Sequence, residues 1–214
     1  KSIPKTVCLT ANLPQGDVAI GSGAVVSSDG YILTCAHVLE AAENLGDNTL
    51  GALFPNGKTL EAKTLGRDSK RDFVLLKVEA EHLPFFEWGD SSQMKSGAWV
   101  LALGHPIGIV GIQGRRNRIP ALSYGNILTL NAQLKVSTES GGKDYGGSIL
   151  SNIPLAFGNS GGPLVNSEGK LIGLNGAISR GATIQAYSIA SNRMSAAFPK
   201  LKEGIDLSVP PKGK

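Results

Sequence analysis

Short runs of alternating or β-branched residues, each bounded by Gly, Asp or Asn, recur at close intervals along this chain and restrict what it can fold into. Runs of this length and composition are typical of strands joined by tight turns. They are TVCLT, AIGSGAVV, YILT, TLGALF, FVLLKV, AWVLAL, GNILTL, KLIGL and TIQAYSI. With 28 glycines, 11 prolines and 18% charged residues, the pattern predicts an all-β protein with many antiparallel strands.

Turn residues give the clearest local predictions. Ser28, Asp29 and Gly30 lie between AVV and YILT, and Asn56 with Gly57 lies between LF and TL, so a hairpin is expected at each place. The polar segment 87–97 separates two strand groups and predicts a crossing between two subdomains. The expected division is residues 1–90, residues 91–203, and a tail or linker over 204–214.

Helical signals are scarce. A turn or two is expected after His37, in HVLEAAEN. Near the end of the chain Met194, Ala197, Phe198 and Leu201 fall at i, i+3, i+4 and i+7, which predicts an amphipathic helix packed on the second half.

Composition excludes several classes of protein. The net charge is +4, and the basic residues are scattered apart from Arg115, Arg116 and Arg118, while aromatic residues make up 6%. A nucleic-acid surface would need a wider basic stripe with interleaved aromatics. No run approaches the ~20 apolar residues of a membrane span. Nothing in the sequence indicates a cofactor or a metal site.

Cysteine use and the first residue bear on the compartment. Cys8 and Cys35 could pair, but two cysteines are too few to indicate a disulfide framework, so we expect two buried thiols without a disulfide. The chain begins at Lys1 with neither a Met nor a signal peptide, which fits a mature exported protein and equally a chain trimmed for expression.

The run GNSGGP, residues 158–163, carries the strongest chemical signal. It presents Ser160 among glycines that allow backbone amides to approach a substrate carbonyl. Gly158, Asn159 and Ser160 are the candidate oxyanion-hole residues, with the N–H groups of Gly158 and Ser160 able to point at one position. Because a serine alone is a weak nucleophile, the interpretation requires a histidine base and an orienting carboxylate.

The chain offers three histidines. His37 follows the run YILT at a junction that would hold its ring at the edge of a cleft, so it is the candidate base. His82 lies in a charged stretch and His105 in GHPIG, and for both a structural role is expected.

Two aspartates compete for the orienting role. Asp72 opens the apolar run FVLLKV, where a carboxylate can be buried beside an imidazole, so it is preferred. Asp68 lies outside that run and is expected to face water.

Together, GSGAVVSSDGYILTCAHV, RDFVLLKV, LALGHPIG and GNSGGPLVNSEGKLIGLN resemble the HtrA/Deg branch of the trypsin-like serine proteases over most of residues 18–195. The resemblance implies a chymotrypsin-like fold of two six-stranded antiparallel β-barrels, with short helices and a C-terminal helix. It places His37 and Asp72 in an N-terminal barrel (residues 1–90) and Ser160 in a C-terminal barrel (residues 91–203). The implied activity is a serine endopeptidase with this triad.

The resemblance also implies the substrate-binding residues. They come from the segment before the nucleophile and from the segment after LIGL: Pro154, Leu155, Ala156, Phe157, Asn175, Gly176 and Ala177. None is charged, which predicts cleavage after small or medium aliphatic residues. The strand near Asn175 would bind unfolded or extended polypeptides by strand addition.

Two alternatives to an active protease stay open. One is an inactive or resting-state peptide-binding, chaperone-like module on the same fold. The other is an esterase, although the strand-to-helix elbow of that class is absent because Gly162 leads into a β run.

Several features differ from the family pattern. Residues 109–122 form a longer connection that contains the arginine cluster, and residues 134–148 stand at the family's activation-sensing loop, where their glycines predict mobility. The lead-in NIPLAFG replaces a polar one. A homotrimer is the family's assembly, but residues 1–5 lack the aromatic residues that many relatives use for it. The resemblance implies an exported location: periplasmic, extracellular or an organelle lumen.

Overall fold

The computed structural model describes the chain except for residues 15, 47–49, 107–117, 139–140, 181–183 and 210–214. Arg115 and Arg116, and most of the connection 109–122, therefore lie outside the described residues. No described helix is both long enough and apolar enough to cross a membrane.

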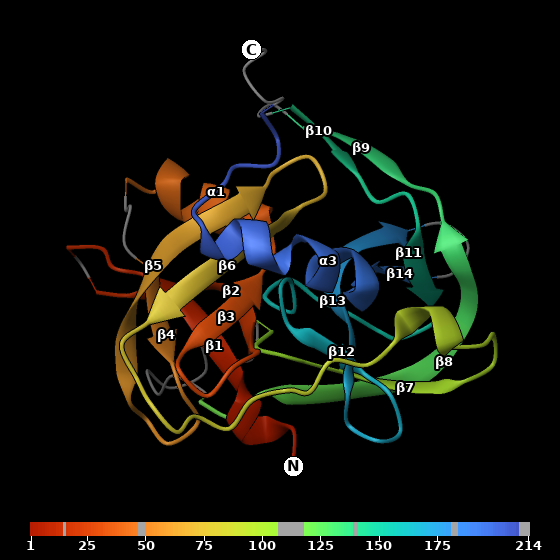
Figure 1. Cartoon of the computed structure of the whole chain (residues 1–214), viewed down its shortest axis with the longest axis horizontal. Helices are drawn as coiled ribbons and strands as arrows, with labels where there is room; N and C mark the ends of the chain where they lie inside the picture. Colours follow the sequence, from red (N-terminus) through yellow and green to blue (C-terminus); the bar gives the residue numbers. More distant parts are fainter. Residues whose placement is uncertain (15, 47–49, 107–117, 139–140, 181–183, 210–214) are drawn as a thin grey trace.

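Six strands of the first half close into a barrel in the order β1-β2-β3-β6-β5-β4 (Figure 1). Their bounds are β1 (Thr6–Ala11), β2 (Val18–Val25), β3 (Tyr31–Thr34), β4 (Leu50–Leu53), β5 (Thr59–Asp68) and β6 (Phe73–Val78), preceded by a short helix η1 (Ile3–Lys5). Apolar residues of β3 and β6 are fully buried, among them Ile32, Leu33, Phe73 and Leu75.

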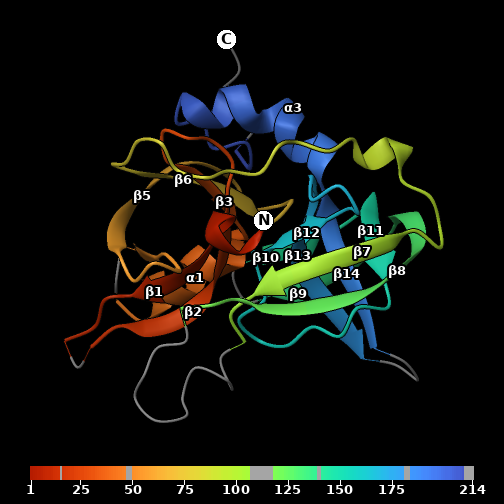
Figure 2. The ribbon, with the colours of Figure 1, turned by 90° about the horizontal axis from the view of Figure 1, so that it is seen from below.

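The second half forms another closed barrel, in the order β11-β14-β13-β12-β7-β8. Its strands are β7 (Trp99–Gly104), β8 (Ala121–Ala132), β11 (Ser148–Ser151), β12 (Pro163–Val165), β13 (Leu171–Arg180) and β14 (Ile184–Ala190), and η2 (Ser91–Gln93) lies on the crossing from the first barrel. Figure 2 shows the barrels side by side with the C-terminal helix across both. The predicted fold class is confirmed.

The segment 134–148 forms a separate two-stranded hairpin, with β9 (Lys135–Thr138) antiparallel to β10 (Gly141–Asp144). It extends from the second barrel toward the first (Figure 1). Neither strand was among the predicted runs, because apart from Val136 their residues are polar or glycine and carry no apolar alternation.

Both predicted hairpin turns are confirmed. The backbone N–H of Val26 donates to the carbonyl of Tyr31 at 2.8 Å around the first turn, and that of Phe54 donates to the carbonyl of Lys58 at 2.8 Å around the second. Gly30 and Gly57 have φ of 99° and 91°, a left-handed conformation that glycine adopts without strain.

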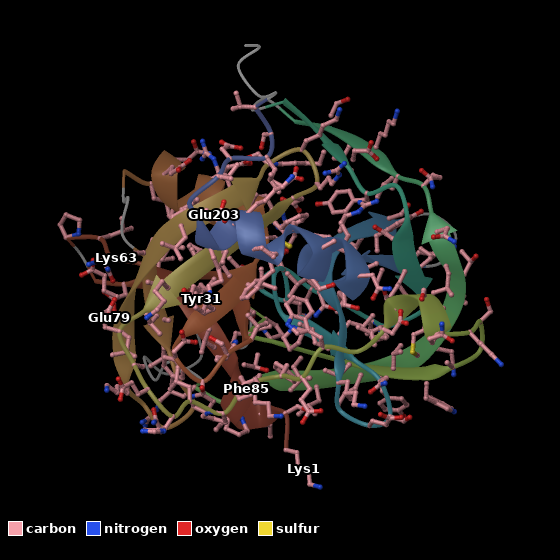
Figure 3. All side chains as sticks on the ribbon, viewed as in Figure 1. Lys1, Tyr31, Lys63, Glu79, Phe85 and Glu203 are labelled. Atoms are coloured by element: carbon pink, nitrogen blue, oxygen red, sulfur yellow. The ribbon has the colours of Figure 1, made fainter. Side chains whose placement is uncertain are left out.

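The C-terminal helix α3 (Ser191–Lys202) buries Met194 and Leu201 as predicted, but its packing differs from the expectation. It lies across both barrels rather than on the second alone. The ring of Phe198 meets Tyr31 of β3 edge to face, with ring centroids 5.7 Å apart. Figure 3 labels Tyr31 on the first barrel. The apolar stripe is wide enough to cover the seam between the barrels.

As far as it is described, the chain after α3 returns to the first barrel. Asp206 forms an ion pair with Arg67 at 2.9 Å, and the amide of Leu207 donates to the Arg67 carbonyl at 2.8 Å. The amide of Ser69 donates to the hydroxyl of Ser208 at 2.6 Å. These contacts fasten residues 206–208 to the end of β5.

Candidate active site

A cleft of about 420 Å³ is lined by residues of both barrels. The first barrel and its helix α1 (Ala36–Asn44) contribute one group of lining residues, and the second barrel contributes the rest. The lining residues are Ala19, Ile20, His37, Ala41, Leu155, Ala156, Phe157, Gly158, Asn159, Ser160, Asn175, Gly176, Ala177 and Ile178. His37 and Ser160 therefore face the same cavity, although 123 positions separate them in the sequence.

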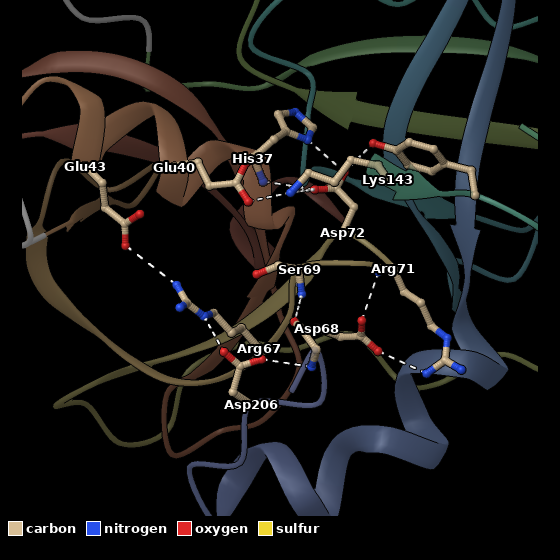
Figure 4. Close-up of polar contacts among 12 residues, drawn as sticks. His37, Glu40, Glu43, Arg67, Asp68, Ser69, Arg71, Asp72, Lys143 and Asp206 are labelled. Carbon is tan, nitrogen blue, oxygen red and sulfur yellow. Dashed lines mark hydrogen bonds and ion pairs between the residues drawn. The ribbon is translucent and has the colours of Figure 1, made fainter. Parts of the chain in front are cut away.

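His37 and Asp72 are joined by two hydrogen bonds. The ring Nδ1 of His37 lies 2.8 Å from Oδ2 of Asp72, and the backbone N–H of His37 donates to Oδ1 at 2.9 Å (Figure 4). Asp72 is only 1% exposed, while the histidine ring is about one-third exposed. The carboxylate therefore favours the tautomer with its proton on Nδ1 and leaves Nε2 as a hydrogen-bond acceptor.

The backbone of Asp72 adopts an unusual conformation at the start of β6. Its φ is 63°, in the left-handed region, which aspartate tolerates better than most residues. The carbonyl of Asp72 also accepts the N–H of Ala36 at 3.2 Å. This local strain turns the carboxylate toward the first turn of α1.

Ser160 lies in a tight loop between β11 and β12. Its glycine neighbours are required by close packing: a Cβ on Gly161 would lie 2.0 Å from Oγ1 of Thr34, and one on Gly162 would lie 2.1 Å from the carbonyl oxygen of Leu103. Gly161 also has φ of 78°. The loop therefore presses directly against the first barrel, which sets where the Ser160 hydroxyl stands.

The backbone amides of the loop fall into two groups. The N–H of Asn159 donates to the carbonyl of Ala156 at 3.1 Å, and that of Gly161 donates to Asn175 at 2.8 Å. Within the described part of the chain, no group accepts a hydrogen bond from the amides of Gly158 or Ser160. The amide of Asn159 is thus engaged within the loop, whereas the amides of Gly158 and Ser160 remain available as donors.

Residues 21–174 match the family model of the trypsin-like peptidase domain. The chain belongs to this family. The trypsin-like peptidase domain is also 38% identical over 160 residues to a probable periplasmic serine endoprotease DegP-like of Halomonas elongata, covering 75% of this chain and 30% of that protein. It is 36% identical over 170 residues to the putative serine protease HhoB of Synechocystis sp., covering 79% and 37% respectively.

Solved structures agree with this assignment. The HtrA-type protease AlgW with a bound tripeptide superposes with a TM-score of 0.76 at 25% identity, over 94% of this chain and 61% of that one. This trypsin-like peptidase is therefore homologous to the DegP/HtrA serine proteases, as the motifs indicated. The chain spans only about a third of the length of the two curated relatives.

Six of the seven predicted substrate-binding residues line the cleft, and Pro154 does not. Phe157 stands at its edge, 73% exposed. In this trypsin-like peptidase β12 pairs with β13 only as far as Leu174, so no described strand covers that edge of β13 from Gly176 onward. Gly176, Ala177 and Ile178 of this edge also line the cleft. The open edge of the strand therefore lies in the same cleft as His37 and Ser160.

Ser22 is a residue of the site that the sequence analysis missed. Its hydroxyl donates to the carbonyl of Gly158 at 2.8 Å and accepts the backbone N–H of His105 at 2.9 Å, while its amide donates to the carbonyl of Ser160 at 2.9 Å. Its place in the run AIGSGAVV gave no signal beyond a strand. Only the approach of the second barrel gives this serine its partners.

His105, His82 and Asp68, which the sequence analysis also considered, do not line the cleft. His105 is buried, and burial lowers its pKa to about 4, so it stays neutral near pH 7. His82 is exposed in a turn with φ of 57°. Asp68 was expected to face water, and this is wrong: it is buried and accepts the backbone N–H of Arg71 at 2.9 Å and its guanidinium at 3.1 Å. It closes the turn before β6.

Cys8 and Cys35 are buried thiols without a disulfide, as predicted. Sγ of Cys35, a ring nitrogen of His37 and a carboxylate oxygen of Asp72 lie within 4.8 Å of one another, so their geometry could enclose a metal ion. Burial and the nearby Asp72 raise the pKa of the Cys35 thiol, which donates to the carbonyl of Asn175 at 3.3 Å. A protonated thiol is a poor metal ligand, so the group fits a hydrogen-bonded cluster better than a metal site.

Proposed function

We propose that this chain is a serine endopeptidase domain in which Ser160 is the nucleophile, His37 the general base and Asp72 the residue that orients the base. The observation that carries the proposal is the pair of hydrogen bonds between His37 and the buried Asp72, at the edge of a cleft that Ser160 also lines. Burial of that carboxylate allows it to stabilise an imidazolium during the reaction.

The proposed mechanism has two steps. Oγ of Ser160 attacks the substrate carbonyl carbon as Nε2 of His37 takes its proton, and the amides of Gly158 and Ser160 stabilise the oxyanion. The imidazolium then protonates the leaving amine, which breaks the peptide bond and leaves an acyl-enzyme. A water molecule repeats the sequence at the acyl carbon, and the acid product leaves with Ser160 restored.

The cleft supports extended polypeptides as substrates. The open edge of β13 from Gly176 onward would pair with a substrate backbone as an added strand. Apart from His37, none of the lining residues carries an ionisable side chain. We therefore propose that the residue before the scissile bond is small or medium and aliphatic.

A fluorophosphonate probe tests the nucleophile. The wild type should be labelled in an activity-dependent manner, and Ser160→Ala should remove the label. Ser92→Ala is a matched control, because Ser92 is exposed and lies outside the cleft. A folded wild type that takes no label, or labelling that survives Ser160→Ala, would contradict the proposal.

Peptide turnover tests the specificity. In a series that differs only before the scissile bond, Ala and Val peptides should have higher kcat/KM than Lys and Asp peptides. Burying an unpaired charge in the apolar cleft costs free energy, so at least a tenfold difference, about 1.4 kcal/mol, is expected. Equal turnover of the Lys peptide would contradict the assignment of the pocket.

One observation favours a resting state as a second candidate. Among the described residues, no hydrogen bond joins the hydroxyl of Ser160 to His37. Such bonds often tighten only when substrate binds. If unfolded casein binds without turnover, the peptide-binding, chaperone-like module is favoured, whereas turnover supports the endopeptidase.

The location and assembly are proposals as well. The Halomonas relative is named periplasmic, which supports an exported location for this chain. A homotrimer stays a prediction. Light scattering on the purified chain would distinguish a trimer from a monomer.

A further inference from the structure

The β9–β10 hairpin of the second barrel reaches the turn that carries Asp72 in the first. The backbone N–H of Asp144, at the end of β10, donates to the carbonyl of Lys70 at 2.7 Å. The amide of Tyr145 donates back to the carbonyl of Leu134 at 2.8 Å, which closes the base of the hairpin. The hairpin is thus attached to the first barrel two residues before Asp72.

Tyr145 follows the hairpin and is only 3% exposed. Its hydroxyl donates to Oδ2 of Asp72, the same oxygen that lies 2.8 Å from Nδ1 of His37. Its ring packs over Gly176 in the cleft wall, where a Cβ would lie 2.7 Å from the ring Cε1. Burial raises the pKa of Tyr145 above its ordinary value, so the phenol stays a donor at any working pH.

Lys143 approaches the other carboxylate oxygen. It is 5% exposed, and its Nζ lies 3.8 Å from Oδ1 of Asp72. The same ammonium forms a hydrogen-bonded ion pair with Glu40 of α1 (Figure 4). A buried lysine is costly unless it is paired, and here both partners belong to the first barrel.

We propose that Tyr145 and Lys143 are positioning residues, which the β9–β10 hairpin brings against Asp72 to fix its carboxylate toward His37. The proposal rests on the function proposed above. It follows that the His37–Asp72 pair is complete only when the hairpin is docked, so the second barrel contributes to the base as well as the nucleophile.

The physical effect has two parts. The phenol occupies one lone pair of Oδ2 and leaves another directed at Nδ1, which restricts rotation of the carboxylate. Both the phenol and the ammonium also withdraw negative charge from Asp72, so the imidazolium of His37 is less stabilised. Among the described residues, the ionisable groups that face this pair are Cys35 just before α1, Glu40 of α1, Lys143 of β10 and Tyr145 just after β10.

Tyr145→Phe tests the phenol with little change in volume. Fluorophosphonate labelling on the pH plateau should fall about tenfold, the equivalent of about 1.4 kcal/mol, because the carboxylate is less well oriented. The acidic limb of the pH–rate profile should move to higher pH, because the imidazolium is better stabilised. Tyr124→Phe, at an exposed residue of β8, should change neither quantity.

Lys143→Met tests the ammonium in the same way, and Lys135→Met is its matched control on the exposed face of the same hairpin. The acidic limb of the pH–rate profile should again move to higher pH in Lys143→Met and should not move in Lys135→Met. If Tyr145→Phe and Lys143→Met lower the rate at every pH without moving the limb, the two residues act only by supporting the fold and the proposal is overturned.

NMR of the His37 ring separates this proposal from the proposed function. The pH at which the ring signal is half-shifted should move upward in Tyr145→Phe and Lys143→Met, whether or not the chain turns over substrate. An unlabelled wild type with a moved ring signal would reject the endopeptidase alone. An unmoved signal in both variants would reject the positioning role alone.

Discussion

Ser22, in β2 of the first barrel, donates its hydroxyl to the carbonyl oxygen of Gly158 in the nucleophile loop of the second barrel, at 2.8 Å. The same hydroxyl accepts the backbone N–H of His105 at 2.9 Å, and the Ser22 amide donates to the carbonyl of Ser160 at 2.9 Å. One buried serine therefore fixes the backbone on both sides of Asn159 and so the direction of the neighbouring amides.

Ser22→Ala should lower both stability and activity. It leaves the Gly158 carbonyl and the His105 amide without this partner, and a buried unsatisfied group costs about 1–3 kcal/mol. Urea unfolding measures the stability, and the rate of fluorophosphonate labelling measures the reactivity of Ser160 in the nucleophile loop. Ser27→Ala, which removes only a turn contact to Tyr31, is the control and should leave the labelling rate unchanged. An equal effect of both variants on labelling would contradict the role of Ser22.

Substitution of the two buried aspartates before β6 should have very different effects on the labelling rate. Asp72→Asn removes the acceptor that orients His37, and we expect a loss of about 10³- to 10⁴-fold in labelling rate. Asp68→Asn changes a buried carboxylate of the same turn that is hydrogen-bonded to Arg71 and not to His37, so the labelling rate should stay within about threefold of the wild type. Comparable losses in the two variants would argue against Asp72 as the orienting residue.

His105 should make the protein less stable in mild acid. Its folded pKa is about 4 because it is buried, against an ordinary value of 6.5. Between these values the unfolded chain binds more protons, so stability is lost as the pH falls. From pH 7 to pH 5 the loss should be about 2 kcal/mol. Urea unfolding of His105→Gln should lack this part of the pH dependence, and His82→Gln should retain it.

Gly161→Ala should be much more destabilising than Gly97→Ala. Both glycines have positive φ, 78° and 85°, so both substitutions strain the backbone. A Cβ at Gly97 meets no atom within 4 Å, whereas one at Gly161 would lie 2.0 Å from Oγ1 of Thr34. The clash should add about 1–3 kcal/mol to the loss in unfolding free energy. Equal losses would mean that the loop can move away from the first barrel.

Local patterns predicted the parts of the fold whose signal lies within a few residues. Alternating apolar runs became strands, Asn56 with Gly57 became a hairpin, and the apolar stripe of α3 became a helix. The hairpin at Asn56 and Gly57 implied that a strand begins at Thr59, but the extent of β5 was not predicted. Its exposed residues are charged or polar, and its place is set by pairing with β4 and β6. The packing of α3 across both barrels was missed because it depends on the distance between the barrels.

The same division applies to the site. Sequence signals for Ser160, His37 and Asp72 lie within a few residues of each position. They could be recognised without the tertiary structure because the proposed chemistry requires particular residue types in each short segment. Asp68 was misjudged, since its burial comes from tertiary packing rather than from its neighbours in sequence. Ser22 lies within the segment GSGAVV, but neither it nor Tyr145 carries a sequence signal of its role in the site. Their partners lie 136 and 73 positions away, so only closure and packing of the two barrels bring the atoms into contact.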